Sequence, residues 1–136
     1  MTQEEKELLF KDLCARLPYG VLYKHFTWND KCGEIYIAAR IYSINTDGYV
    51  KNCYDDETVY IDNVRPYLFP LSSMTEEQKK EYQYITERWM NDPTYSISDS
   101  IDWLNKHHFD YRGLIEKGLA IDATGTDIYD VPEELL

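Results

Sequence analysis

The chain has 136 residues, with 14 lysines and arginines against 25 aspartates and glutamates, and 13 of its residues are tyrosines. This length, with 43% hydrophobic residues, is enough for one cored domain and too little for two independent ones. The formal net charge of −11 has the wrong sign for a protein that neutralises nucleic-acid phosphates, so direct nucleic-acid binding and attachment to an anionic membrane are both disfavoured.

The first ten residues, MTQEEKELLF, are charged from the fourth position and carry no apolar core before a small-residue cleavage site. We therefore expect no secretory signal, and no apolar run approaches the ~20 residues of a membrane-spanning helix. The cysteines Cys14, Cys32 and Cys53 are odd in number and form no CxxC pair, which argues against a disulfide framework and a zinc site. A cytoplasmic protein with free thiols, no metal and no cofactor is expected.

The N-terminal residues predict an amphipathic helix over residues 3–17. Thr2 and Glu5 have the spacing of a capping box, and Pro18 to Gly20 end the pattern. Apolar residues recur between them at i, i+3, i+4 and i+7: Phe10, Leu13, Cys14 and Leu17.

Four segments with strand character follow, over residues 21–28, 34–44, 49–54 and 58–62. The pair Asp47 and Gly48 suits a tight hairpin turn between the second and third of them. This pattern predicts a four-stranded antiparallel sheet, open or curled into a small SH3-like barrel. Pro66 and Pro70 then predict an extended connector, because neither can donate a hydrogen bond to a strand ladder.

Helical signals return after the connector. Thr75 with Gln78, or Ser73 with Glu76, can cap a helix that runs to about Met90. After Asn91 to Pro93, a cap at Ser96 or Ser98 predicts a second helix reaching His108, and residues 111–117 before Gly118 predict a short third one. The fold class is thus α+β, with one domain over residues 1–118, its sheet part at 21–64 and its helical part at 73–118.

Charge is uneven along this plan. Residues 1–70 hold 8 basic and 11 acidic side chains, whereas residues 71–136 hold 6 and 14. Residues 119–136 contain five acids and no lysine or arginine, which is typical of a tail that is mobile or lies against a partner.

No catalytic, cofactor-binding or metal residue is predicted. The chain has neither of the phosphate-binding patterns GxGxxG and GxxxxGK[ST]. His107 and His108 are adjacent and point about 100° apart on a helix, so they cannot chelate one ion together, and His25 has no visible partner. The acids at 55–57 are typical of a solvated turn, and Asp99 with Asp102 are typical of the first turn of a helix.

Tyrosines are the remaining signal, since six of them fall on predicted strands. Packing across the sheet is the simpler interpretation, and an aromatic binding face is the alternative. The tyrosines expected on such a face are Tyr36, Tyr42, Tyr49 and Tyr60.

Three segments, at residues 8–21, 66–84 and 103–123, resemble a group of small acidic hypothetical proteins of gut anaerobic bacteria and their prophages or other mobile elements. They read LLFKDLCARLPYGV, PYLFPLSSMTEEQKKEYQY and WLNKHHFDYRGLIEKGLAIDA. The resemblance covers somewhat over half of the chain and carries no activity, cofactor or catalytic residue. It implies a phage-linked cytoplasmic protein that acts as a binding or regulatory module.

The leading hypothesis is therefore a non-enzymatic module that binds a host or phage protein, with a homo-oligomer also compatible. An alternative is inhibition of a nucleic-acid-processing or defence enzyme by charge mimicry, through Glu76, Glu77 and Glu81 on one helix. A further alternative is a dimeric sponge for a small nucleotide, with Arg40, Arg65 and Arg112 as candidate contacts.

Overall fold

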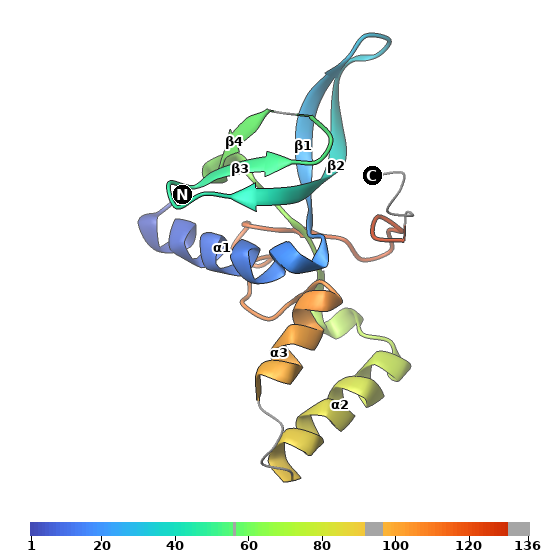
Figure 1. Cartoon of the computed structure of the whole chain (residues 1–136). Coiled ribbons are helices and arrows are strands. Elements are labelled where there is room, and N and C mark those ends of the chain that lie inside the picture. The colour runs from blue at the N-terminus through green and yellow to red at the C-terminus, as the bar shows by residue number, and fades with distance from the viewer. Residues whose placement is uncertain (56, 92–96, 131–136) are drawn as a thin grey trace.

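The computed structural model describes residues 1–55, 57–91 and 97–130, without the side chains of residues 89–91 and 97. It shows an α+β protein (Figure 1): a helix under a curved antiparallel sheet, then a helical hairpin and a small parallel sheet. This architecture confirms the predicted fold class. No helix within the described residues is long and apolar enough to span a membrane.

Helix α1 (Gln3–Arg16) begins at the predicted capping box. The Thr2 hydroxyl accepts the Glu5 N–H at 3.1 Å, and the Glu5 carboxylate accepts the Thr2 N–H at 3.0 Å. The predicted apolar stripe was wrong at one of its four residues, because Cys14 is exposed. A short 3-10 turn, η1 (Leu17–Tyr19), follows the helix. The buried side chains of α1 are Leu9, Asp12, Leu13 and Arg16. Asp12 and Arg16 form an ion pair inside the protein.

The predicted antiparallel meander is confirmed. Strands β1 (Leu22–Asn29), β2 (Gly33–Ile44), β3 (Tyr49–Asn52) and β4 (Thr58–Tyr60) pair in sequence order and curve into a half-barrel. β2 pairs with β1 as far as Arg40 and with β3 from Ile41 onward, and a register shift between Ile41 and Ser43 interrupts the pairing with β3. Gly48 makes the β2–β3 turn with φ +89°, where a Cβ would lie 3.2 Å from Ile61.

Two segments link this sheet to the rest of the chain. The turn η2 (Ile61–Asn63) leads to β5 (Tyr67–Pro70), and the turn η3 (Leu71–Ser73) follows it. β5 is the extended connector that was predicted, but it is also the centre of a parallel sheet with β6 (Phe109–Asp110) and β7 (Ile121–Asp122). Two-residue strands have no periodicity, so nothing in the sequence indicated this second sheet.

Helices α2 (Glu76–Asn91) and α3 (Ile97–Lys106) form a hairpin that extends away from the first sheet (Figure 1). Thr75 and Gln78 make the reciprocal bonds of the first predicted capping pair, at 2.9 and 3.1 Å. Of the two residues predicted to cap α3, Ser96 lies outside the described residues. The predicted third helix at 111–117 is instead a series of turns, because the Asp110 carboxylate accepts the N–H groups of Leu114 and Ile115.

The acidic C-terminal stretch is packed against the domain as far as the structure describes it. Leu119, Ala120 and Ala123 are buried. The Tyr129 hydroxyl donates to the Tyr67 carbonyl at 2.6 Å and accepts the Leu22 N–H at 3.0 Å, which ties this segment to β5 and to the start of β1. Residues 131–136 lie outside the described residues.

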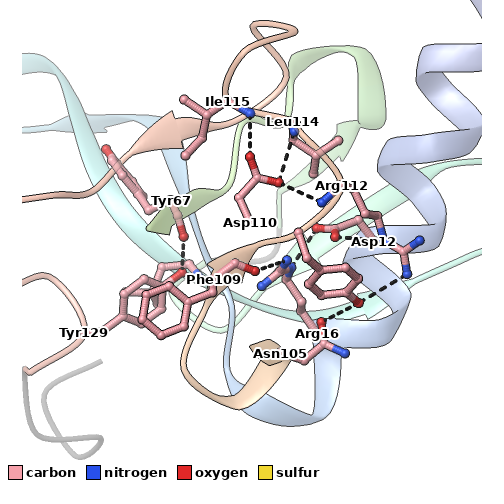
Figure 2. Close-up of polar contacts among 12 residues, drawn as sticks. Asp12, Arg16, Tyr67, Asn105, Phe109, Asp110, Arg112, Leu114, Ile115 and Tyr129 are labelled. Carbon is pink, nitrogen blue, oxygen red and sulfur yellow. Dashed lines mark hydrogen bonds and ion pairs between the residues drawn. The ribbon is translucent and has the colours of Figure 1, made fainter. Parts of the chain in front are cut away.

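A buried polar network joins α1 to the end of the helical hairpin (Figure 2). Asp12 accepts Arg16 Nε at 2.7 Å and Arg112 Nε at 3.1 Å, while Arg16 Nη2 donates to the Phe109 carbonyl at 2.6 Å. The Tyr111 hydroxyl donates to Asn105 at 2.9 Å. Asp12 and Arg16 are both fully buried, so their charges compensate each other away from water.

Candidate functional site

The β1–β2 hairpin projects beyond the rest of the sheet as an arm (Figure 1). Its antiparallel register places Phe26 opposite Tyr36 and Trp28 opposite Glu34. Because side chains alternate between the two faces of a strand, these residues share the outer face of the arm. Phe26, Trp28 and Tyr36 expose 46%, 67% and 63% of their surface. We call these three residues the aromatic patch.

Two residues of the aromatic patch, Phe26 and Tyr36, are held by ring contacts. The rings of Phe26 and Tyr36 meet edge to face with their centroids 5.4 Å apart. Lys24 Nζ lies 4.5 Å from the centroid of the Tyr36 ring, on the same face. Aromatic side chains that are held in place and remain exposed offer apolar surface at a low cost in conformational entropy.

The opposite face of the arm carries a polar network around His25, which is only 2% exposed. His25 Nδ1 lies 3.1 Å from the Tyr23 hydroxyl, and His25 Nε2 lies 3.0 Å from Asp55 Oδ2. Asn52 Nδ2 donates to the Tyr23 oxygen at 2.9 Å and to Asp55 Oδ1 at 3.2 Å. We call Tyr23, His25, Asn52 and Asp55 the His25 network.

The hydrogen bonds of Asn52 determine where the protons of this network lie. Its Oδ1 accepts the backbone N–H groups of Tyr54 and Asp55 at 2.8 Å each, so its Nδ2 must face the Tyr23 oxygen. The Tyr23 hydroxyl keeps its own proton, which it can donate to His25 Nδ1. The Asp55 carboxylate can only accept, so His25 Nε2 carries a proton and donates it to Asp55.

Asp55 is held as a carboxylate in this arrangement. Burial raises its pKa, but hydrogen bonds from His25, from the Glu57 N–H and from Asn52 together outweigh burial and lower the pKa below its usual value. Burial also raises the pKa of the Tyr23 hydroxyl, so Tyr23 stays protonated as the network requires. An ionised Asp55 places a carboxylate charge at this point of the sheet.

His25, Asp55 and Glu57 are the residues of the described chain that come closest to a metal site. One ligand atom from each lies within 4.8 Å of the others, and Glu57 Oε2 lies 3.8 Å from His25 Nε2. A divalent ion would need the lone pair of Nε2, which in this network bears the proton. Moving that proton to Nδ1 would deprive the Tyr23 hydroxyl of its acceptor. The hydrogen bonds thus favour the metal-free form.

A hollow of about 390 Å³ lies beside this network, between β1 and the β4 region. His25 and Phe26 of β1 line one side, and Glu57 and Val59 line the other. Glu57 is 65% exposed on its side chain and Asp55 is 24% exposed, so both carboxylates can be reached from solvent. We call this hollow the β1–β4 seam. Tyr23 is fully buried, so its hydroxyl offers no nucleophile to a substrate there.

The tyrosines predicted for one binding face lie in separate places. Tyr36 belongs to the aromatic patch, whereas Tyr42 and Tyr49 line a second hollow at the register shift between β2 and β3. Tyr60 is half-buried against the core and against the Tyr49 ring, 5.4 Å away. The predicted acids Glu76, Glu77 and Glu81 are exposed on α2, at the other end of the molecule.

Two features of the site could not be found by residue spacing. His25 and Asp55 are 30 residues apart and meet only through the fold. Phe26 and Trp28 were assigned to a strand without their exposed face being recognised, because an alternating strand can turn either face to the core. The alternation of His25 and Thr27 with Phe26 and Trp28 would by itself place the two aromatic residues in the core, the reverse of what the structure shows.

His108 has a structural place in the core, away from the aromatic patch. It stacks on the Tyr129 ring with centroids 3.6 Å apart and adopts φ +62°. Burial, the charge of Arg16 and the charge of His107 lower its pKa to about 4. His107 packs its ring 4.4 Å from that of Trp103. The two histidines therefore face different surroundings and form no joint site.

Comparison of the chain with protein-family models, with curated proteins and with solved structures finds no match.

Proposed function

We propose that this protein is a non-enzymatic binding module that engages a protein partner through the aromatic patch. The observation that carries the proposal is the exposure of three large aromatic residues side by side on the projecting arm. Phe26, Trp28 and Tyr36 would each lose apolar surface to a partner on binding. Tryptophan and tyrosine are the residues that most often dominate the energy of such interfaces.

The resemblance to proteins of gut anaerobes and their mobile elements supports a regulatory role for such a module in the cytoplasm. The partner would then be a bacterial or phage protein. The first sheet is a half-barrel in the free protein, and a closed SH3-like barrel is the form we propose for it when a partner segment fills the β1–β4 seam.

Charge mimicry receives less support from the side chains of α2. Glu76, Glu77 and Glu81 are exposed, but Lys79 and Lys80 are exposed between them, and Lys79 pairs with Glu76 at 3.2 Å. A helix that alternates sign presents no continuous row of phosphate-like charges.

The nucleotide-sponge hypothesis is also weakly supported, because its candidate arginines already take part in contacts within the protein. Arg112 donates to Asp12, and Arg65 donates to the Val64 carbonyl at 2.9 Å. Arg40 packs its guanidinium near Gly20.

The test is affinity capture from a lysate of a gut anaerobe with the wild-type protein and with the triple variant F26S/W28S/Y36S. Specific capture should be lost in the triple variant and kept in Tyr84→Ser, which removes an aromatic residue of similar exposure from α2. Thermal unfolding of both variants checks that they are folded. Equal capture by the triple variant and the wild type, or no specific capture by the wild type, would refute the proposal.

A further inference from the structure

The edge of β1 has backbone groups that point away from β2. The N–H of Ile41 donates to the Val21 carbonyl, so odd-numbered residues of β1 face β2 through their backbone. Even-numbered residues face the other way, and the Lys24 N–H does so by donating to the Arg65 carbonyl at 3.1 Å. Phe26 and Trp28 continue this alternation. In the part of the chain that the structure describes, β1 is paired on this side only by the bridge from Tyr23 to Pro66.

This open edge borders the β1–β4 seam, which is lined by Glu57 and by His25, the hydrogen-bond partner of Asp55. An extended segment that pairs with β1 would place alternate side chains on the two faces of the sheet. Residues opposite Phe26 and Trp28 would cover the aromatic patch. Their neighbours in the segment would lie on the face of His25 and Thr27, next to Asp55 and Glu57.

We infer that the β1 edge binds an extended segment of a partner protein in which lysine or arginine alternates with apolar residues. The apolar side chains lie over the aromatic patch, and the basic side chain reaches Asp55 and Glu57. Backbone hydrogen bonds to Phe26 and Trp28 supply strand addition, a common mode of peptide recognition. This inference rests on the proposed function and specifies the chemistry of its partner.

Charge excludes a second copy of this chain as a good occupant of the same edge. If two β1 strands paired antiparallel about Thr27, each copy would bring its own Asp55 and Glu57 to the shared edge. Two acidic pairs would then approach each other in a protein whose net charge is already −11. A basic segment removes this repulsion and provides the counter-charge.

The direct test measures binding of the blocked, fluorescently labelled peptide TVKVKVT to the full chain by anisotropy, with TVEVEVT as the charge-reversed control. We expect TVKVKVT to bind and TVEVEVT to bind at least about tenfold more weakly, with the difference reduced at high salt. Glu57→Lys should weaken TVKVKVT by about tenfold, whereas Glu77→Lys, an equal charge reversal on exposed α2, should not.

The geometry of strand addition is tested with N-methylated peptides. In antiparallel pairing the valines of TVKVKVT present their N–H groups to β1, so N-methyl valine should abolish binding and N-methyl lysine should not. Equal binding of TVEVEVT, no binding of TVKVKVT, or binding that survives N-methyl valine overturns the inference. A concentration-dependent dimer of the wild type that is seen by sedimentation and is dissociated by Trp28→Pro also overturns the inference. If protein capture depends on F26S/W28S/Y36S while TVKVKVT fails to bind, only the inference is lost and the proposed function remains.

Discussion

Removal of the Asp12 carboxylate should be among the most damaging single changes that the fold can receive. Asp12→Ala leaves the Arg16 guanidinium fully buried, with the Phe109 carbonyl as its remaining hydrogen-bond acceptor among the described residues. The substitution also removes the Asp12 oxygen that accepts from Arg112 Nε at 3.1 Å. Breaking a buried ion pair by removing one member costs about 3–5 kcal/mol. This is a large part of the roughly 5–15 kcal/mol by which a single domain is stable.

The assay is urea unfolding followed by tryptophan fluorescence. With a slope of about 2 kcal/mol per molar urea, the expected loss lowers the unfolding midpoint by about 2 M. Glu76→Ala is the matched control, because it breaks an exposed pair with Lys79 at 3.2 Å and should change stability by less than about 1 kcal/mol. The double variant D12L/R16M removes both charges and should recover much of the loss. A loss below about 1 kcal/mol in Asp12→Ala would refute the buried-charge reasoning.

Three other predictions concern the C-terminal segment and the two histidine sites. The pKa of His108 is lowered from 6.5 to about 4, so the folded state favours the neutral ring. The resulting stability is present above pH 6.5 and is lost as the pH falls toward 4. The total loss in the free energy of unfolding is about 3 kcal/mol. His108→Asn, which tolerates φ +62°, should flatten the pH dependence of the urea midpoint over that interval. Tyr129→Phe leaves the Leu22 N–H and the Tyr67 carbonyl without this partner, and should cost about 1–3 kcal/mol in the same assay, where no change would contradict the tie between the C-terminal segment and β1. Because the His25 Nε2 proton is donated to Asp55, added Zn²⁺ or Mn²⁺ should raise the thermal midpoint no more for the wild type than for His25→Asn, and a larger rise in the wild type would show a metal site.

The local elements of this protein follow from the sequence because their signals are local. The capping boxes at Thr2 and at Thr75, the Asp47–Gly48 turn and the four alternating segments each involve residues within a few positions of one another. Hydrogen-bonding side chains and conformational preferences act over that range, so helix starts and strand order could be predicted. The negative charge of the second half of the chain was equally evident from the sequence.

The tertiary structure alone decided which faces of these elements are buried and which residues meet. Asp12 and Arg16 have the residue types of a solvent-exposed helix face, yet they are buried. Their hydrogen-bond partners, Arg112 and the Phe109 carbonyl, are about 100 residues away in the sequence. The parallel sheet and the packed C-terminal segment depend on contacts of the same long range. His25 gains its partner only when the β3–β4 connection folds over β1. Burial of polar groups is favourable only when such partners are present, and the local sequence does not indicate which distant residues will supply them.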